Sequence, residues 1–181
     1  MEINIHKLKS HSKTEMELIN KLVYETNRKF FLEIGAYHFE LSEYFLGRLS
    51  NVEGKVISVD WKNQLEIKSN LLKHNRCFRF IEGNSMSPGI IKQVENELGE
   101  NKCDVVFIDG GHQYPIVKSD TENYADLVSD EGYIFWHDAC SRVIPFIDEL
   151  RSLKCPFGLF EDDRGLAYIK GDKWKEWKKS M

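Results

Sequence analysis

The sequence predicts an α/β fold, a three-layer sandwich around a mostly parallel sheet of seven strands that ends in a C-terminal antiparallel hairpin. Short apolar runs alternate with helix-like segments along most of the chain, which is typical of such folds. Two extended runs then follow each other across a short polar turn, as in a hairpin. The 181 residues, 41% of them hydrophobic, suffice for one sizeable core but not for two domains of normal size.

Residues 1–28 are expected to form a polar arm followed by a helix. Ser12 and Glu15 fit a capping box, in which each side chain accepts a hydrogen bond from the backbone N–H of the other residue. The helix is expected to run from this cap to about Arg28. One apolar face of it contains Met16, Ile19, Leu22 and Val23.

Residues 29–172 are expected to form the domain itself. Strands are predicted at the apolar runs 30–35, 56–60, 77–81, 104–109 and 132–136. Helices are predicted over 39–50, 63–74, 88–99, 115–128 and 142–153, and Pro88 and Pro115 suit the first turn of a helix. The hairpin is predicted from 157–161 and 165–170, joined by Asp162, Asp163 and Arg164. The basic tail, 173–181, is expected to be a solvated helix that packs one of its tryptophans, Trp174 or Trp177.

The composition argues against several kinds of partner and environment. The chain has 29 acidic and 25 basic residues, and its net charge of −4 argues against nucleic acid, which needs a basic surface. No apolar run approaches the ~20 residues of a membrane span, and the first residues lack the apolar stretch of a signal peptide. The four cysteines form no CxxC pair, which indicates reduced thiols of a cytoplasmic protein.

Acidic and imidazole side chains gather where the predicted strands end. These positions are Glu33 with Gly35, Asp60, Asn84 with Ser85, Asp109 with His112, and His137 with Asp138. Each has a structural alternative, such as capping the next helix or making a turn. If the strands before Asp109 and His137 are neighbours, two carboxylates and two imidazoles share one cleft. The repulsion between the carboxylates would then be compensated by a hard divalent cation such as Mg²⁺.

Three stretches of the sequence carry a resemblance to a known family. They are Phe107–Tyr114 (FIDGGHQY), Val117–Asp120 (VKSD) and Glu131–Asp138 (EGYIFWHD). The chain resembles the class I S-adenosylmethionine-dependent methyltransferases over about residues 28–170, and most of all the small-molecule and sugar O-methyltransferases with a FIDGxHxY…D…GG…HD signature. The resemblance implies a Rossmann-like fold, S-adenosylmethionine as the cofactor and a small hydroxylated acceptor, such as a sugar or polyol.

The resemblance also implies roles for individual residues. Asp60 would bind the cofactor ribose, because a carboxylate can accept from two vicinal hydroxyls. Trp61 would lie near the adenine or in the core, and Asn84 and Ser85 would lie beside the adenine. Asp109 and Asp138 would hold Mg²⁺, and Asp109 would also border the cofactor. His112 would be the general base, and His137 would orient the site or bind substrate. Glu33 would complete the metal site, or serve a cofactor-side or structural role.

The first-strand motif departs from the family pattern. The family has E-x-G-x-G-x-G, whereas this chain has Glu33-Ile34-Gly35-Ala36-Tyr37-His38-Phe39. The missing glycines matter because glycine alone readily adopts some of the backbone conformations that let the chain approach a cofactor. Some sugar O-methyltransferases also have an aromatic residue at the position of Tyr37. Phe39 is compatible with the fold if it opens the next helix and packs against the sheet.

Two other functions remain open from the sequence. One is a non-catalytic domain of the same fold that binds a partner or another ligand. The other is a metal-dependent oxygenase that uses the cluster Asp109, His112, His137 and Asp138, with both imidazoles and one carboxylate holding iron. The chain has no cap domain, so substrate would be enclosed by the N-terminal helix, by the segment around Ser141 and Arg142, or by the second subunit of a homodimer.

Overall fold

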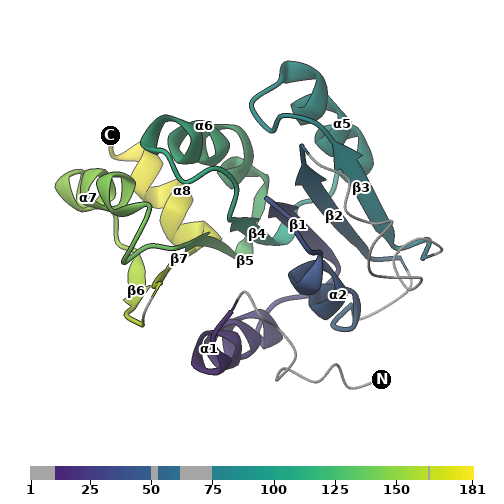
Figure 1. The fold of residues 1–181 in the computed structure, drawn as a ribbon, viewed down its shortest axis with the longest axis horizontal. Helices are drawn as coiled ribbons and strands as arrows, with labels where there is room; N and C mark the ends of the chain where they lie inside the picture. Colours follow the sequence, from purple (N-terminus) through teal and green to yellow (C-terminus); the bar gives the residue numbers. More distant parts are fainter. Residues whose placement is uncertain (1–10, 50–52, 62–74, 163) are drawn as a thin grey trace.

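The computed structural model describes residues 11–49, 53–61, 75–162 and 164–181 (Figure 1). The predicted helix over 63–74 lies outside these residues, and so does Asp163. The strands are β1 (Phe30–Ile34), β2 (Lys55–Asp60), β3 (Phe78–Glu82), β4 (Cys103–Ile108), β5 (Val128–His137), β6 (Gly158–Phe160) and β7 (Leu166–Lys170). The described helices are α1 (Lys13–Tyr24), α2 (Glu40–Leu46), α5 (Pro88–Leu98), α6 (Tyr114–Tyr124) with the 3₁₀ turn η2 (Ala125–Leu127), α7 (Ile144–Ser152) and α8 (Gly171–Lys179).

The strands form one seven-stranded sheet in the order β3-β2-β1-β4-β5-β7-β6. β1 to β5 are parallel, while β7 runs antiparallel between β5 and β6. The predicted Rossmann-like α/β fold, with its mostly parallel sheet and C-terminal hairpin, is therefore confirmed. The hairpin docks through its second strand, so that β7 rather than β6 extends the parallel part of the sheet.

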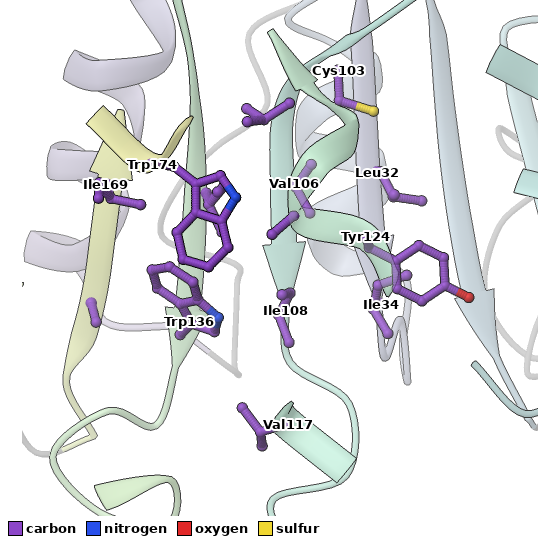
Figure 2. Close-up of a cluster of buried hydrophobic side chains, with 14 of the residues drawn as sticks. Leu32, Ile34, Cys103, Val106, Ile108, Val117, Tyr124, Trp136, Ile169 and Trp174 are labelled. Atoms are coloured by element: carbon purple, nitrogen blue, oxygen red, sulfur yellow. The ribbon is translucent and has the colours of Figure 1, made fainter. Parts of the chain in front are cut away.

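Helices cover both faces of the sheet and make the three layers (Figure 1). Along β4, Val105 and Phe107 pack with α1 and α2, whereas Val106 and Ile108 pack on the opposite face with α5, α6, α7 and α8. This alternation follows from the two-residue period of a strand. Both faces are buried, which is why the central strands are continuous apolar runs in the sequence. Figure 2 shows the cluster on the face of α6 and α8.

The N-terminal helix begins as the sequence predicts but ends earlier. Ser12 caps α1, and Ser12 and Glu15 form the full capping box. The helix ends at Tyr24, and Arg28 adopts a left-handed conformation with φ of 53° before β1 begins. Of the predicted apolar face, Met16, Ile19 and Val23 are buried and Leu22 is partly buried.

The C-terminal helix α8 buries both of its tryptophans, one more than expected. Trp174 and Trp177 pack against each other at a ring distance of 5.1 Å, and Trp174 also packs on Trp136 of β5. Each indole N–H has an acceptor, Oδ1 of Asp126 for Trp174 and the Leu153 carbonyl for Trp177, both at 2.9 Å. These hydrogen bonds offset the cost of burying both polar groups. None of the described helices is long and apolar enough to cross a membrane.

Candidate functional site

The carboxyl ends of the parallel strands meet at one edge of the sheet, and the predicted site residues lie there. Asp109 follows β4 directly, while His137 ends β5 and Asp138 follows it. β4 and β5 are neighbours, with Ile108 paired to Trp136. The two strands that precede Asp109 and Asp138 are therefore neighbours, as the predicted grouping of these residues requires. They end at the edge where open α/β sheets bind ligands.

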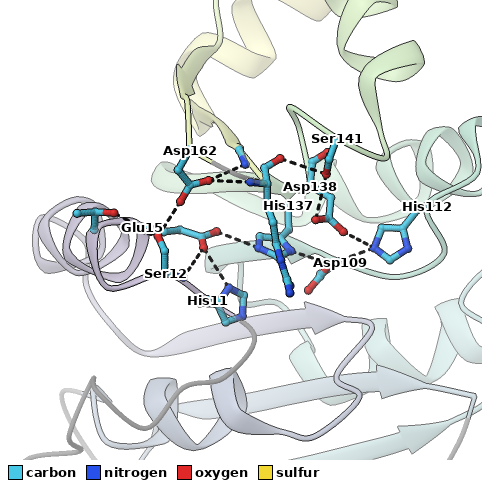
Figure 3. Close-up of polar contacts among 12 residues, drawn as sticks. His11, Ser12, Glu15, Asp109, His112, His137, Asp138, Ser141 and Asp162 are labelled. Carbon is cyan, nitrogen blue, oxygen red and sulfur yellow. Dashed lines mark hydrogen bonds and ion pairs between the residues drawn. The ribbon is translucent and has the colours of Figure 1, made fainter.

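His112 lies between the two carboxylates predicted to bind metal. Its Nε2 atom is 2.7 Å from Oδ2 of Asp138 and 3.7 Å from Oδ1 of Asp109 (Figure 3). The imidazole is 32% exposed, whereas the side chain of Asp138 is buried. A group bound at this edge can therefore contact His112, while the carboxylate of Asp138 behind it is shielded from water.

The charges of this cluster shift the pKa values of its members. Contacts with Asp109 and Asp138 raise the pKa of His112 to about 9. Burial opposes the charge on His137, yet its contacts with Asp109 and Glu15 raise its pKa to about 10. Burial likewise opposes ionisation of both aspartates, but the neighbouring imidazoles hold the pKa of Asp109 and of Asp138 below the ordinary value. The imidazoles thus balance carboxylates that would otherwise repel one another.

His137 has a carboxylate on each side. Its Nδ1 atom is 3.1 Å from Oδ1 of Asp109, and its Nε2 atom is 3.2 Å from Oε1 of Glu15 in α1. The other oxygen of Glu15 is 3.5 Å from Nδ1 of His11. A row of charged groups therefore connects the N-terminal helix to Asp109 (Figure 3). The sequence left open whether His137 orients the site or binds substrate, and its buried ring contacts both of these carboxylates.

Asp138 is held in an uncommon backbone conformation. Its φ is 56°, in the left-handed region. Its Oδ1 atom accepts a hydrogen bond from the Ser141 hydroxyl at 3.3 Å, and the next residue, Ala139, donates to the carbonyl of Gly165. Such strain persists only where surrounding contacts enforce it, and it is common at functional sites.

Two sets of side chains bring potential metal-ligand atoms within 4.8 Å of one another in the described part of the chain. One set is Asp109, His137 and Asp138, and the other is His11, Glu15 and His137. His112 belongs to neither set. The pair of histidines required by the iron-site alternative, His112 and His137, therefore does not converge with a carboxylate within that distance.

Glu33 lies in the core and is absent from both sets. It accepts hydrogen bonds from the hydroxyls of Ser42 in α2 and Ser58 in β2. Burial raises the pKa of Glu33 to about 8. Of the readings that the sequence left open for Glu33, a structural or cofactor-side role agrees best with this position.

The loop after β1 has the backbone shape that glycines usually provide. Gly35 has a φ of 90°, and a Cβ atom there would lie 2.2 Å from the carbonyl oxygen of Asp109. Tyr37 and Phe39, which replace two glycines of the family motif, have φ values of 40° and 58°. The loop therefore keeps left-handed residues where the motif has glycine, at a cost in backbone strain.

The two aromatic residues of this loop differ in burial, because Phe39 faces the core and Tyr37 faces solvent. Phe39 caps α2, is buried, and packs edge-on against Phe78 and Phe80 of β3. The prediction that Phe39 opens the helix and packs against the sheet is confirmed. Tyr37 is 60% exposed.

The predicted ribose-binding residue is tied to this loop. Oδ2 of Asp60 accepts a hydrogen bond from the backbone N–H of Tyr37 at 2.7 Å. Trp61, the next residue, is 83% exposed, which excludes the alternative that it is a core residue. The hydrogen bond thus connects the ends of β1 and β2, and the exposed side chain of Trp61 lies next to Asp60 in the sequence.

The residues predicted to border the adenine lie in the loop between β3 and α5. Asn84 is exposed there, and the carbonyl of Ser85 accepts a hydrogen bond from the Tyr124 hydroxyl at 2.7 Å. Asp120 of α6 is fully buried, near Ser85 and Gly110. No hydrogen bond of normal geometry reaches its carboxylate among the described residues, and burial raises its pKa to about 6.

Glu15 and His11 were not predicted as site residues. The sequence indicated only that Glu15 caps the helix, which it does. A signal was nevertheless present, because Glu15 precedes Ile19 by four residues and Val23 by eight and so falls on the apolar face of α1. A carboxylate on such a face requires a buried partner.

The comparisons agree with this architecture. Residues 32–139 match the model of a family described as a methyltransferase domain. No curated protein matches the chain in sequence. A Staphylococcus aureus structure assigned as a caffeoyl-CoA O-methyltransferase is 22% identical, with a TM-score of 0.71 over 92% of this chain and 87% of that one.

Two further structures share the fold. MycE, a methyltransferase of mycinamycin biosynthesis solved with Mg and SAH, is 15% identical with a TM-score of 0.63 over 92% of this chain. This chain spans about half of MycE, covering 52% of its length. CalS11, a calicheamicin methyltransferase, is 12% identical with a TM-score of 0.64, over 92% of this chain and 82% of that one.

Proposed function

The chain belongs to the methyltransferase-domain family, and on this premise we propose that it transfers the methyl group of S-adenosylmethionine to a hydroxyl of a small molecule with the help of a divalent cation. The observation that carries the proposal is the position of His112 between Asp109 and Asp138 at the carboxyl edge of the sheet. This arrangement unites a base with two oxygen-donor groups at the place where the fold binds its ligands.

The cofactor fits the residues at the ends of β1, β2 and β3. The absence of a Cβ atom at Gly35 lets the loop after β1 lie directly against the backbone of Asp109, which brings the predicted cofactor residues next to the end of β4. Asp60 binds the ribose hydroxyls, with its Oδ2 atom already fixed by the Tyr37 N–H. Trp61, Asn84 and Ser85 border the adenine, and Glu33 supports the loop from beneath through its contacts with Ser42 and Ser58.

The acceptor is activated by the groups at the ends of β4 and β5. Asp109 and Asp138 would hold the cation, since carboxylate oxygens are the ligands that Mg²⁺ prefers. When bound, Mg²⁺ supplies a charge that lowers the pKa of a neighbouring hydroxyl. A cation held by Asp109 and Asp138 would offset the carboxylate charge that raises the pKa of His112, and so would favour its neutral form. The hydroxyl would lose its proton to this neutral imidazole while its oxygen bonds to the methyl carbon. The bond from that carbon to the sulfonium sulfur breaks, leaving S-adenosylhomocysteine and a methyl ether.

The acceptor class is inferred as a small polyhydroxylated molecule such as a sugar. MycE was solved with Mg, SAH and mycinamycin VI, and CalS11 is described as a TDP-rhamnose 3′-O-methyltransferase. Both are relatives by fold, so they support the class of acceptor rather than its identity. We infer that α1 and the segment around Ser141 and Arg142 border the acceptor, unless a second subunit covers this side.

Calorimetry with S-adenosylmethionine and S-adenosylhomocysteine tests the cofactor assignment. We expect binding of both to the wild type and a loss of at least about tenfold in Asp60→Ala, because two charge-assisted hydrogen bonds disappear. Glu82→Gln, an exposed acid at the end of the neighbouring strand, is the matched control. Absence of heat with both ligands would contradict the proposal. Mass spectrometry of a panel of sugars and polyols, with Mg²⁺ or with chelator, then identifies the methylated product.

A further inference from the structure

We propose that His11, Glu15 and His137 form a binding site for a borderline divalent transition metal ion, represented by Zn²⁺. These side chains come from the turn before α1, from α1 and from the end of β5, and they converge in Figure 3. Each offers a ligand atom within 4.8 Å of the other two. Two imidazoles and one carboxylate form a donor set that Zn²⁺ uses in proteins. The site is separate from the proposed cation site at Asp109 and Asp138.

The three candidate ligand atoms are buried without a well-formed hydrogen bond. The side chains are 4%, 1% and 1% exposed for His11, Glu15 and His137. Nδ1 of His11, Oε1 of Glu15 and Nε2 of His137 make no hydrogen bond of normal geometry among the described residues. Buried polar atoms rarely remain in that state. A shared ion would take the place of the proton between Glu15 and His137 and give all three side chains a common centre in place of the ion pairs of Glu15 with the two imidazoles.

The distances between the side chains agree with tetrahedral coordination. Nε2 of His137 is 3.2 Å from Oε1 of Glu15, and Nδ1 of His11 is 3.5 Å from Oε2, the other oxygen of the same carboxylate. Ligands placed about 2.0–2.2 Å from Zn²⁺ at tetrahedral angles lie roughly 3.3–3.6 Å from one another. The side chains therefore need little movement to bind the ion.

The two nitrogens of His137 separate this site from the site of the reaction. Nδ1 faces Asp109 at 3.1 Å, while Nε2 faces Glu15. A histidine that binds metal through one nitrogen usually donates its other N–H to a carboxylate, which fixes the ring. Asp109 is in the position for that role. Oxygen ligands suit Mg²⁺ and imidazole suits Zn²⁺, so the two sites select different ions.

A metal ion bound at this site would link the N-terminal helix α1 to the sheet. α1 packs on the sheet through Met16, Ile19 and Val23, and the ion adds a polar link from Glu15 and His11 to β5. Because His137 also contacts Asp109, this metal-mediated link would hold one carboxylate of the proposed active site in position. Metal binding to the folded state alone must raise the unfolding temperature.

Metal titration of the full chain tests the site without any methyl acceptor or donor. Protein stripped with a chelator is titrated with Zn²⁺ against a chromophoric competitor, and Co²⁺ replaces Zn²⁺ to record the visible spectrum of a tetrahedral site. We expect one Zn²⁺ per chain, a higher unfolding temperature, and affinity at least about tenfold weaker in Glu15→Gln and in His11→Gln. Glu17→Gln, an exposed glutamate on the same helix, should bind as the wild type does.

Asp138→Asn separates this site from its neighbour, because it alters the proposed Mg²⁺ cluster but leaves all three ligands in place. Full Zn²⁺ binding in Asp138→Asn agrees with the proposal. Absence of stoichiometric binding to the wild type overturns it, as does binding lost in Asp138→Asn and kept in Glu15→Gln. If neither ligand variant folds, X-ray absorption on the loaded wild type decides, since two imidazole ligands are required. Failure of methyl transfer leaves these outcomes unaffected.

Discussion

The Nε2 atom of His112 lies 2.7 Å from Oδ2 of Asp138, so the proposed base and a proposed metal ligand are in direct contact. The two residues come from different strand ends, with Asp138 at the end of β5 and His112 three residues beyond Asp109 at the end of β4. Any group bound by the carboxylates therefore lies within reach of the imidazole. Cation binding and proton removal should depend on separate atoms of one cluster.

Replacing His112 by alanine tests the proton-transfer step. We expect turnover to fall about 10²- to 10⁴-fold, the usual contribution of a general base. Affinity for S-adenosylmethionine should remain close to that of the wild type, because the cofactor is assigned to the ends of β1, β2 and β3. Steady-state kinetics and calorimetry on the same preparation measure the two effects. Wild-type turnover in His112→Ala would exclude the role.

Replacing Asp109 by asparagine tests the cation. The change removes one of two carboxylates whose charge attracts a divalent ion. We expect Asp109→Asn to lose the dependence of turnover on Mg²⁺ and to remain at the rate of the chelator-treated wild type. Asp148→Asn, an exposed acid on α7, is the control for charge and should keep the wild-type response. An unchanged response in Asp109→Asn would contradict the assignment.

Local patterns in the sequence predict the order of strands and helices, because the two-residue period and the proline and glycine positions act within a few residues. Strand ends were predicted less well. β5 begins at Val128, although the sequence suggested position 132. The polar residues 129–131 concealed the early start of β5 in the sequence. The strand is held there by backbone pairing of Val128 with Cys103, which does not require apolar side chains.

The strand-end residues of the candidate site were also predictable, because parallel strands place their carboxyl ends at one edge. The contacts that connect Asp109 through His137 to Glu15 and His11 could not be predicted from the sequence. It depends on α1 packing against a strand more than a hundred positions later in the chain, and no local spacing encodes that contact. Only the position of Glu15 on the apolar face of α1 signalled a buried partner.

Glycine substitutions at the two left-handed aromatic positions should change the free energy of unfolding by different amounts. Tyr37→Gly relieves a strained backbone and exchanges an exposed ring, so we expect the free energy of unfolding to change by less than about 1 kcal/mol. Phe39→Gly relieves similar strain but empties a buried site against Phe78 and Phe80, and should destabilise by about 2–4 kcal/mol. Urea unfolding of both variants measures the difference. Equal effects would mean that the packing of Phe39 adds nothing to stability.

The buried carboxylate of Asp120 should make stability depend on pH. Burial raises its pKa in the folded state to about 6, from an ordinary value of 3.8. The unfolded chain therefore releases this proton at lower pH than the folded chain. The contribution of Asp120 is most favourable below about pH 4 and falls by about 3 kcal/mol as the pH rises through about 6.

Asp120→Asn should remove this loss, because asparagine occupies the same volume without a titratable proton. Compared with the wild type, the variant should gain stability as the pH rises from about 4 to about 8, measured by urea unfolding at each pH. Glu122→Gln, exposed on the same helix, controls for the change of one charge and should follow the wild-type curve. Parallel curves for the wild type and Asp120→Asn across this range would show that the carboxylate keeps its charge when folded, held by its contact with the Ser85 hydroxyl.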